Sequence, residues 1–356
     1  MQILSVVGAR PQFIKAYAVS NELRKEHDEV LVHTGQHYDE EMSDVFFEEL
    51  DIPRPDHNLG VGSDTHANQT AEMMVGLEEL VHHYEPDVLL CYGDTNSTLA
   101  SGIVGSKEDV VFAHVEAGLR SFNREMPEEI NRILTDHAAD LLFAPSERAM
   151  EYLESEGITE RAHNVGDVMY DALLSAREKA VSQSTILDEL DLRDEAYLLA
   201  TVHRPRNTDD RERLEAILET LAADDRRVVL PAHPRTVDRL EQYGLLDAIE
   251  EEVTLIDPVG YLDFINLQAN ADIIITDSGG IQKEAFFLDI PCVTLRGETE
   301  WPETIEAGGN ILVGADRNAI RDALANPPQS TFDAKPYGDG NAAQRIQDIL
   351  ERYDEI

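Results

Sequence analysis

The chain has 356 residues, which is longer than a single hydrophobic core usually grows, so we expect two domains. Its 71 Asp and Glu residues against 29 Lys and Arg residues give a formal net charge of -42, and only six of the basic residues are Lys. This charge argues against nucleic acid and anionic membranes as partners, because both repel an acidic surface. The same composition is typical of proteins from a high-salt cytoplasm, where ~1 M salt shortens the Debye length to about 3 Å.

Two Cys residues, Cys91 and Cys292, lie far apart inside apolar runs, so we expect buried thiols rather than a disulfide or a metal site. The amino terminus lacks the basic start and the cleavage site of a secretion signal, and no run approaches the ~20 apolar residues of a membrane span. We therefore expect a cytoplasmic protein without a membrane partner.

Short apolar runs rich in Val, Ile and Leu alternate with longer mixed segments along the chain. Because the hydrophobicity within each run is continuous, both faces of each strand are covered, as in a parallel sheet between helices. An early Pro11 indicates the start of the first helix, and Thr70 indicates the start of another. The pattern predicts an α/β fold with strands at residues 3–7, 30–34, 87–92, 110–115, 141–145, 197–201, 227–232, 253–257, 273–276, 292–295 and 311–314.

A charged amphipathic stretch without a predicted strand covers residues 168–196, and the alternation of strands and helices starts afresh at Tyr197. We place the domain boundary there, which predicts a first domain of residues 1–167 and a second domain of residues 168–341. The tail contains a loop rich in Pro and Gly, followed by an amphipathic helix from about Ala342.

Ionisable residues gather directly after the predicted strands, where the loops of a parallel sheet converge and ligands bind. In the first half these residues are Arg10, Lys15, Asp94, Glu116 and, further along, Glu128. In the second half they are His203, Arg204, His233 and Arg296, and the polar Ser278 follows another of the strands. Any single member is explained equally well as a solvated turn residue. The whole set at one edge of both sheets favours a ligand site.

The stretch "ITDSGGIQKEA" places Ser278, Gly279 and Gly280 between an apolar strand and a helix. At such a helix start, free backbone N–H groups and the helix dipole favour an anion, and glycine permits close approach of the backbone. This predicts a phosphate site, and the alternative is a tight turn with Ser278 as a simple N-cap. Glu284 lies on the same helix and gains a role only if a nucleotide ribose binds nearby.

"GARPQFIK" is a second candidate anion site, because Arg10 and Lys15 flank one strand-to-helix turn and can face the same oxygens. It is neither a Walker loop nor G-x-G-x-x-G, so bound ATP or a nicotinamide cofactor is not indicated. No spacing of His and Cys resembles a zinc site, and Asp94 alone is weak evidence for magnesium. We therefore expect neither a metal nor a cofactor.

Glu116 and Glu128 lie in the charged stretches "HVEAGLR" and "MPEEINR", which a solvated loop would also explain. A catalytic role is favoured because the predicted strand of residues 110–115 leads directly to Glu116, so a rigid element would hold this carboxylate. His203 occupies the equivalent edge of the second sheet. A lone His is more often structural, but this position favours function.

Together these stretches resemble the non-hydrolysing UDP-N-acetylglucosamine 2-epimerases. The motifs follow the family's order over nearly the whole chain: "GARPQFIK", "TGQHYD", "GDTNS", "HVEAGLRS", "PEEINR", "TVHR", "DSGGIQKEA", "TEWPE" and "PYGDGNAAQRI". The resemblance implies a GT-B-like fold of two Rossmann-type parallel-sheet domains with a cleft between them. It also implies that the last helix, about residues 342–356, returns to the first domain, that the protein is a homodimer, and that it serves polysaccharide biosynthesis.

The family interconverts UDP-GlcNAc and UDP-ManNAc without a metal or nicotinamide, by eliminating UDP to give a 2-acetamidoglucal and adding it back. By this resemblance the catalytic positions are Arg10, Lys15, Asp94, Glu116, Glu128 and His203. The positions that contact the UDP-sugar substrate are Arg10, His233, Ser278, Gly279, Gly280, Glu284 and Arg296.

Two positions depart from the family's pattern: Arg206 stands where a glutamate is usual in "HRPRN", and Trp301 where an arginine is common in "TEWPE". "HANQT" lacks the arginine expected beside Gln69, so we do not expect activation by a second UDP-GlcNAc. Family variants act on UDP-2,3-diacetamido-2,3-dideoxyglucuronate, and the motifs do not separate the two substrates strongly. A GT-B glycosyltransferase and a non-catalytic nucleotide-sugar sensor are further alternatives. A transferase needs an acceptor surface, and we find none in the sequence. A sensor need not keep the carboxylates and His203 together, whereas this sequence has all of them.

Overall fold

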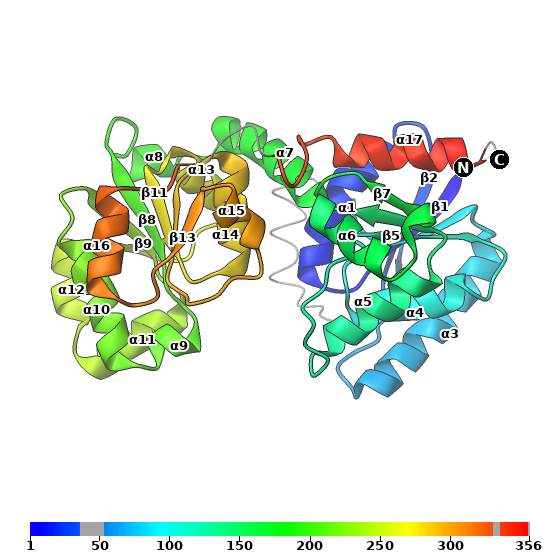
Figure 1. Ribbon diagram of the computed structural model, residues 1–356, viewed down its shortest axis with the longest axis horizontal. Helices are drawn as coiled ribbons and strands as arrows, with labels where there is room; N and C mark the ends of the chain where they lie inside the picture. The colour runs from blue at the N-terminus through cyan, green and yellow to red at the C-terminus, as the bar shows by residue number, and fades with distance from the viewer. Residues whose placement is uncertain (36–52, 330–334, 355–356) are drawn as a thin grey trace. The chain divides into compact units, whose positions relative to one another are not determined.

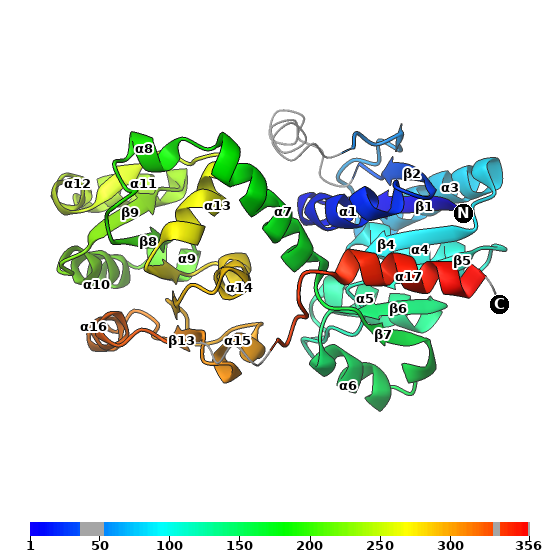
Figure 2. The same ribbon diagram turned by 90° about the horizontal axis from the view of Figure 1, so that it is seen from above.

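The computed structural model describes residues 1–35, 53–329 and 335–354, except the side chains of Arg10, Pro11 and Asp354. The chain forms two compact units, each a parallel sheet flanked by helices (Figures 1 and 2). Unit 1 consists of Met1–Ser175 and Lys335–Ile356, and unit 2 of Ala176–Ala334. The first division falls inside helix α7 (Val168–Gln183), whereas the sequence analysis put the boundaries after residues 167 and 341.

Unit 1 is built on a parallel sheet with the strand order β3-β2-β1-β4-β5-β6-β7. The chain runs outward from β1 to β3 and then returns to β4, on the other side of β1. A topological switch point therefore lies between β1 and β4, where the loops of two adjacent strands diverge and leave room for a ligand. The strands are β1 (Gln2–Val7), β2 (Asp28–His33), β3 (His57–Asn58), β4 (Val88–Tyr92), β5 (Val111–Val115), β6 (Leu141–Ala144) and β7 (Ala162–Asn164).

Helices cover both faces of this sheet (Figure 1). On one face α3, α4 and α5 pack side by side, and on the other α1 lies beside α17. The helices are α1 (Arg10–Leu23), α3 (His66–Tyr84), α4 (Asn96–Gly105), α5 (Pro127–Ala138), α6 (Glu147–Ser155), a short 3-10 helix (Thr159–Arg161), α7 and α17 (Ala342–Asp354). The predicted helix start at Pro11 is confirmed, because proline occupies the first turn of α1.

The predicted helix start at Thr70 is wrong. Helix α3 begins at His66, and the side chain of Thr65 caps it by accepting a hydrogen bond from the backbone N–H of Asn68 at 3.3 Å. Thr70 lies inside the helix, where its hydroxyl donates to the carbonyl of His66 at 2.7 Å. Both threonines precede helix-forming residues, and the sequence pattern gave no reason to prefer the earlier one.

Unit 2 has a second parallel sheet with the order β10-β9-β8-β11-β12-β13. By the same argument its switch point lies between β8 and β11. The strands are β8 (Tyr197–Thr201), β9 (Arg227–Pro231), β10 (Thr254–Ile256), β11 (Ile273–Thr276), β12 (Cys292–Thr294) and β13 (Asn310–Leu312). The helices are α8 (Ile186–Glu189), α9 (Pro205–Thr208), α10 (Arg211–Ala222), α11 (Pro234–Tyr243), α12 (Leu246–Glu252), α13 (Tyr261–Asn270), α14 (Gly279–Leu288), α15 (Pro302–Glu306) and α16 (Arg317–Ala325).

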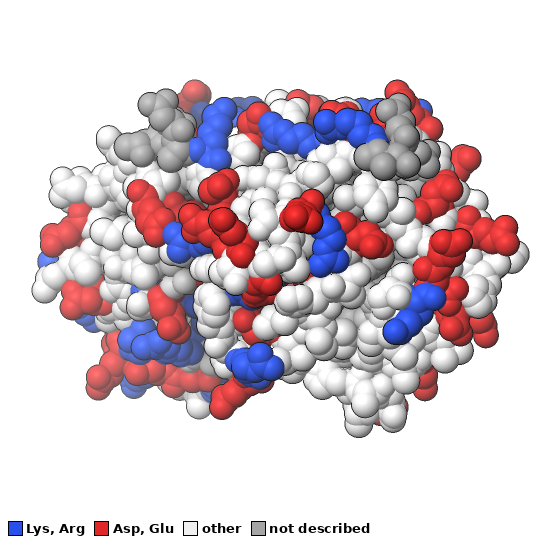
Figure 3. Space-filling model, turned by 45° about the vertical axis from the view of Figure 1, so that its right-hand side comes forward, with Lys and Arg blue, Asp and Glu red and all other residues white. Residues whose placement is uncertain are grey.

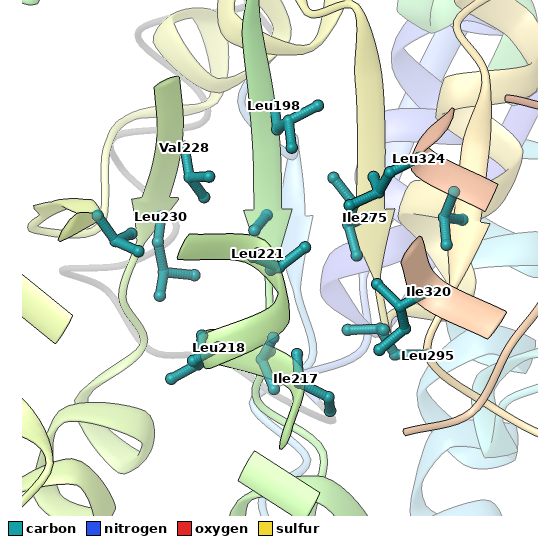
Figure 4. Close-up of a cluster of buried hydrophobic side chains, with 14 of the residues drawn as sticks. Leu198, Ile217, Leu218, Leu221, Val228, Leu230, Ile275, Leu295, Ile320 and Leu324 are labelled. Carbon is teal, nitrogen blue, oxygen red and sulfur yellow. The ribbon is translucent and has the colours of Figure 1, made fainter. Parts of the chain in front are cut away.

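One of the hydrophobic clusters of unit 2 lies between one face of this sheet and helices that include α10 and α16 (Figure 4). Each fully buried Leu or Ile contributes about 1.5–3 kcal/mol relative to an exposed one, so this layer fixes the sheet that carries the loops above it. The contributing residues include Leu198, Leu230 and Ile275 from the strands and Ile217, Leu218, Leu221, Ile320 and Leu324 from the helices.

The carboxy-terminal segment belongs to unit 1 and closes against its β7–α7 loop. The backbone N–H of Asp167 donates to the carbonyl of Tyr337 at 3.0 Å, and the Arg345 guanidinium donates to the carbonyl of Val165 at 3.0 Å. Gly166 has φ +90°, and a Cβ at this position would lie 2.9 Å from the Tyr337 carbonyl oxygen. Glycine is therefore required where the two segments meet.

The predicted fold class, α/β with two Rossmann-like parallel sheets, is confirmed. The apolar runs named in the sequence analysis correspond to strands, while the short edge strands β3 and β7 were not predicted. Cys91 and Cys292 are free thiols buried in β4 and β12, as expected. In the described part of the chain, no helix combines the length and the apolar character needed to cross a bilayer.

Candidate active site

Three candidate residues of unit 1 come together at the β1/β4 switch point, although they belong to separate motifs. Lys15 of α1 forms an ion pair with Glu116, which directly follows β5. Asp94 follows β4, and its carboxylate pairs with Arg132 of α5. A Cβ on Gly93 would lie 3.5 Å from both the Glu116 Oε2 and the Lys15 Nζ atoms. We refer to Lys15, Asp94 and Glu116 as the acid–base cluster.

Burial and neighbouring charges shift the pKa values of two members of the cluster, Lys15 and Asp94. Burial works against the charged form of Lys15, but the Glu116 carboxylate, with help from Asp94, outweighs burial and raises the Lys15 pKa. The pKa of Asp94 is also raised, because burial and the nearby Glu116 charge outweigh the favourable effects of Arg132 and Lys15. A lysine beside a carboxyl group with a raised pKa is a combination suited to proton transfer.

Glu116 is held by an unusual backbone conformation. Its φ is +72°, a left-handed value that is rare outside glycine and that often marks a functional position. The backbone N–H groups of Glu116 and Ala117 both donate to the carbonyl of Phe143, at 3.0 and 3.1 Å. These bonds anchor the turn to β6 and fix the direction in which the carboxylate leaves β5.

Gln12, which the sequence analysis did not select, connects the turns that follow β1 and β4. Its side-chain oxygen accepts the backbone N–H groups of Gly8 and Ala9 at 2.7 and 2.9 Å. Its amide nitrogen donates to the carbonyl of Tyr92 and to the hydroxyl of Thr95, the latter at 3.1 Å. Gln12 lies within the quoted motif "GARPQFIK", so the motif itself was the signal available from sequence.

A network of buried polar residues around His114 and Asp136 holds the loops that carry the acid–base cluster. The ring of His114, on β5, bonds through Nε2 to the carbonyl of Gly93 at 2.7 Å and through Nδ1 to Asp136 at 2.8 Å. Asp136 also accepts hydrogen bonds from the backbone of Gly118 at 3.1 Å and from Arg120 at 2.7 Å. Burial alone would raise the pKa of Asp136, but these partners lower it.

The structure separates Glu128 from its neighbour Glu129. Glu128 is exposed in the first turn of α5, whereas Glu129 is buried and accepts hydrogen bonds from the backbone and hydroxyl of Ser121 at 2.9 and 2.8 Å. These bonds outweigh burial and lower the Glu129 pKa. Glu129 therefore fixes the loop before α5, and Glu128 stays accessible to a ligand. The side chain of Arg10 and residues 36–39 of "TGQHYD" lie outside the described residues.

In unit 2, the buried carboxylate of Asp277 organises the β8/β11 switch point. It accepts the backbone N–H groups of His203 at 3.1 Å and of Arg204 at 2.9 Å, and the side-chain amide of Asn207 at 3.0 Å. Its distance to the His203 Nδ1 atom is 3.3 Å. The sequence analysis missed Asp277, although it directly precedes the selected residues in "DSGG".

The residues 278–280, which we call the glycine turn, form the start of helix α14. Ser278 is its N-cap, and its backbone N–H donates to the hydroxyl of Thr276 at 2.9 Å. In the described chain, a Cβ on Gly280 would meet no atom within 4 Å. The protein's own packing therefore does not require glycine there, and the open space above the turn suits a ligand that approaches the backbone.

Glu284 lies one turn further along α14 and is partly buried. Burial raises its pKa, and a hydrogen bond of 2.9 Å from the side-chain amide of Gln268 on α13 opposes this effect. Gln268 therefore favours the ionised form and fixes the orientation of the carboxylate. A carboxylate held in this way can accept hydrogen bonds from two adjacent hydroxyl groups.

His203 and His233 face each other across the edge of the sheet, with ring centroids 6.0 Å apart. They line a pocket of about 180 Å³ whose other walls are mostly apolar, including Val259 and Phe264. His233 also caps α11, where its Nδ1 accepts the backbone N–H of Arg235 at 3.1 Å. The combination of apolar walls and polar edges is typical of pockets for small planar ligands.

Arg296 and Trp301 occupy the loop that follows β12. Arg296 makes a bidentate ion pair with Glu300, with both N–O distances at 2.8 Å. The ring of Trp301 lies 4.0 Å from the Nζ atom of Lys283, so this departure from the family pattern forms a cation–π contact. Within the described residues, no group of three or more His, Cys, Asp or Glu side chains is arranged to hold a metal ion.

Comparison with known proteins relates both sites to one family. The family model described as UDP-N-acetylglucosamine 2-epimerase matches residues 21–351. A UDP-N-acetylglucosamine 2-epimerase homolog of Methanococcus maripaludis is 50% identical over 355 residues, covering 98% of this chain and 99% of the relative. The UDP-2,3-diacetamido-2,3-dideoxy-D-glucuronate 2-epimerase of Pseudomonas aeruginosa is 46% identical over 362 residues, covering 99% of this chain and 100% of the relative.

A solved structure extends the similarity to the three-dimensional fold. The UDP-GlcNAc 2-epimerase of Methanocaldococcus jannaschii, in complex with UDP-GlcNAc and UDP, is 41% identical and superposes with a TM-score of 0.80, covering 99% of this chain and 100% of that chain. The match in sequence, length and fold leads to one conclusion: this chain belongs to the UDP-N-acetylglucosamine 2-epimerase family.

Proposed function

We propose that this protein interconverts UDP-GlcNAc and UDP-ManNAc by eliminating UDP and adding it back, without net hydrolysis. The observation that carries the proposal is the meeting of Lys15, Asp94 and Glu116 at the switch point of unit 1. The raised pKa values of Lys15 and Asp94, and the ion pair between Lys15 and Glu116, supply groups that can hold and transfer a proton. Family membership, and a relative whose solved structure contains UDP-GlcNAc and UDP, support the same reaction.

Unit 2 would bind the nucleotide part of the substrate. The glycine turn and Arg296 would contact the diphosphate, because a helix start and a guanidinium both favour phosphate oxygens. Glu284 would accept the ribose hydroxyls, and the pocket beside His203 and His233 would receive the uracil ring. Preorganised donors of this kind are each worth roughly 3–4 kcal/mol when charge develops on a leaving group.

The chemistry explains why the leaving group and the proton must be handled together. The C2 proton of the sugar has no adjacent carbonyl to stabilise a carbanion, so its removal must accompany or follow departure of UDP from C1. Loss of both groups gives the 2-acetamidoglucal and free UDP, and return of a proton to the opposite face of C2 together with re-addition of UDP to C1 gives the epimer. Asp94, Glu116 and Glu128 would serve as the acid and base groups on the two faces, each step contributing ~10²–10⁴-fold.

Arg10, Lys15 and His203 would complete the catalytic set proposed for the chain. Lys15 forms an ion pair with Glu116, and its ammonium group would donate a proton to a nearby oxygen atom or stabilise negative charge on it. Asp277 holds the ring of His203 at Nδ1, which directs Nε2 away from the sheet toward a ligand. Water must be kept from the glycal, because its addition would turn the enzyme into a hydrolase.

Exchange with solvent deuterium tests the reaction directly. Incubation of the purified protein with UDP-GlcNAc in concentrated KCl and deuterium oxide should give deuterium at C2 and a mixture with UDP-ManNAc, both visible by NMR. The Glu116→Gln variant serves as the matched control and should leave the sugar unlabelled. An unchanged, unlabelled sugar with the wild-type protein would contradict the proposal, and free UDP with ManNAc would indicate hydrolysis instead.

A second candidate substrate is UDP-2,3-diacetamido-2,3-dideoxyglucuronate. It is favoured by the 46% identity to the Pseudomonas aeruginosa enzyme and by the exposed Arg206, a cation that could pair with a uronate carboxylate. The same deuterium exchange, run with each substrate separately, separates the two candidates. Exchange confined to the diacetamido-uronate would move the substrate assignment and leave the chemistry unchanged.

The setting of the reaction is also a proposal. The net charge of -42 supports a high-salt cytoplasm, and the family supports a role in polysaccharide biosynthesis. Figure 3 shows one face on which acidic side chains lie in many separate groups, as a solvent-facing adaptation requires.

For the homodimer, the adjacent helices α3, α4 and α5 expose Val75, Ile103 and Leu134, with exposed fractions of 59%, 38% and 51%. Sedimentation of the wild type and of Val75→Glu would test this surface, since the variant should sediment as a monomer.

A further inference from the structure

The start of helix α14 already carries a carboxylate from the chain itself. A Cβ on Gly279 would lie 3.3 Å from the Oε2 atom of Glu300 and 3.8 Å from nitrogen atoms of both Arg204 and Arg296. Three charged groups, Arg204 from the loop after β8 and Arg296 and Glu300 from the loop after β12, therefore converge at the first residue of α14. Two of them are cations that suit a phosphate, and the third is an anion in the same place.

The contact between Arg296 and Glu300 has the geometry that a guanidinium also uses for phosphate. Its two terminal nitrogens each donate to a different carboxylate oxygen at 2.8 Å. Burial would raise the Glu300 pKa, but the hydrogen bonds from Arg296 and the charge of Arg204 lower it. Glu300 is therefore an anion where it faces the two arginines.

The two partners differ in how firmly they are held. The Arg296 side chain is 14% exposed, whereas that of Glu300 is 52% exposed. The guanidinium is thus part of the packed loop, and the carboxylate reaches it from solvent. Glu300 can swing outward while Arg296 remains in position, which is what an exchange of one anion for another requires.

We propose that Glu300 is an internal competitor for the ligand's diphosphate, and that Arg204 and Arg296 form the clamp over which the two anions compete. This inference rests on the proposed function, in which residues 278–280 bind the diphosphate of a UDP-sugar. In the unliganded protein Glu300 neutralises the clamp, and binding of the diphosphate displaces it. When the product leaves, Glu300 returns to Arg296, which weakens the hold on the nucleotide and favours release.

The test measures binding of UDP and of uridine by calorimetry to the full-length wild type and to Glu300→Gln. Because the Glu300 carboxylate that UDP displaces is half exposed, its ion pair is weak, and we expect UDP to bind about fivefold more tightly to the variant. Uridine lacks the diphosphate and should bind equally to both proteins. Glu298→Gln is the matched control: Glu298 is exposed, acts on Arg296 only through its charge, and should change the UDP affinity less than twofold.

Substitution of one of the two arginines tests the clamp itself. Arg204→Gln should weaken UDP binding about tenfold and leave uridine binding unchanged, while Arg211→Gln, at an exposed arginine on α10, should change neither. If Glu300→Gln binds UDP as the wild type does, or more weakly, Glu300 is a bystander or a support for Arg296 and the inference is wrong. Absence of UDP binding to the wild type would instead overturn the proposed nucleotide site itself.

Discussion

Asp277 holds His203 through two different parts of the residue, the backbone N–H at 3.1 Å and the ring Nδ1 at 3.3 Å. A fully buried carboxylate thereby fixes both the path of the loop after β8 and the orientation of the imidazole. The same carboxylate accepts the backbone N–H of Arg204 at 2.9 Å. One side chain at the end of β11 therefore sets the positions of His203, which the proposed reaction uses, and of Arg204, which belongs to the proposed clamp.

Asp277→Asn should lower kcat about 100-fold, because the amide cannot accept from every donor that the carboxylate serves and the imidazole loses its orienting partner. The variant should also move the pH profile. Burial lowers the His203 pKa, His233 and Arg204 lower it further, and Asp277 raises it. Removing this carboxylate therefore lowers the pKa again, and the limb that reports His203 should shift to lower pH in measurements of kcat against pH.

A thermal melt accompanies these measurements, because a variant that simply unfolds would also lose activity. Asp263→Asn on α13, which removes a carboxylate that accepts from Ser184 at 2.6 Å, is the control. It should leave the pH profile in place. An unchanged profile in Asp277→Asn, together with full activity, would contradict a positioning role.

The ion pair between Lys15 and Glu116 should be strongly coupled in stability and in activity. Its side chains are 13% and 9% exposed, so removing one partner leaves the other charge poorly solvated. We expect Lys15→Met and Glu116→Gln each to lower the free energy of unfolding by about 3 kcal/mol, near the lower limit for buried pairs. The double variant should recover part of that loss and remain inactive. Urea denaturation of the four proteins gives the coupling energy, and strictly additive losses would refute it.

The Glu284→Gln variant should bind UDP more weakly than the wild type without a loss in the free energy of unfolding. Burial raises the pKa of Glu284, so the folded state holds its proton to a higher pH than the unfolded state does. At a pH below the pKa of Glu284 in the unfolded state, the carboxyl group is protonated in both states and does not change the free energy of unfolding. As the pH rises from there toward the pKa in the folded state, the free energy of unfolding of the wild type decreases. The variant lacks this loss, so its unfolding free energy at pH 7 should equal or exceed that of the wild type.

The same variant should bind UDP about tenfold more weakly, because a neutral amide is a poorer acceptor for ribose hydroxyls than a carboxylate. Binding of UDP should be compared with that of 2',3'-dideoxy-UDP, which lacks both hydroxyls. If the variant weakens both ligands equally, Glu284 does not act on the ribose. A loss of stability at pH 7 would instead show that the ionised form is favourable in the folded protein.

The net charge of -42 predicts that folding depends on salt. Raising KCl from ~0.1 to ~1 M shortens the Debye length from about 10 to about 3 Å, so repulsion between surface carboxylates is largely screened. The melting temperature should therefore rise steeply over this range when followed by circular dichroism. Glycerol at equal osmolality does not screen charge and should not reproduce the rise. A melting temperature independent of KCl would refute the adaptation.

The sequence predicted the sheets well, because continuous apolar runs are the direct consequence of burying a strand on both faces. The strands β3 (His57–Asn58) and β7 (Ala162–Asn164) escaped prediction, since they are short, polar edge strands covered on fewer sides. Thr70 was mistaken for a cap because propensity does not distinguish two threonines ahead of the same helix. Tertiary contacts decide such boundaries.

The candidate site was predictable in its ionisable residues and much less in their supports. Lys15, Glu116 and Asp94 follow strands, which is a visible signal, and the structure brings them together. Gln12 and Asp277 act through hydrogen bonds to backbone groups far away in sequence, and no pattern in the sequence gives those partners. Glu129 likewise differs from Glu128 only in the direction that α5 gives it.

The return of the carboxy-terminal segment to unit 1 affects the order in which the two units can fold while the chain is being translated. The contacts of Tyr337 with Asp167 and of α17 with α1 join two segments of unit 1 that are separated in sequence by unit 2. On a ribosome, unit 2 can complete its core while unit 1 still lacks its last helix. Unit 1 is therefore completed only after its second segment has been made, and a nascent chain truncated before residue 335 would leave α1 without its contacts to α17.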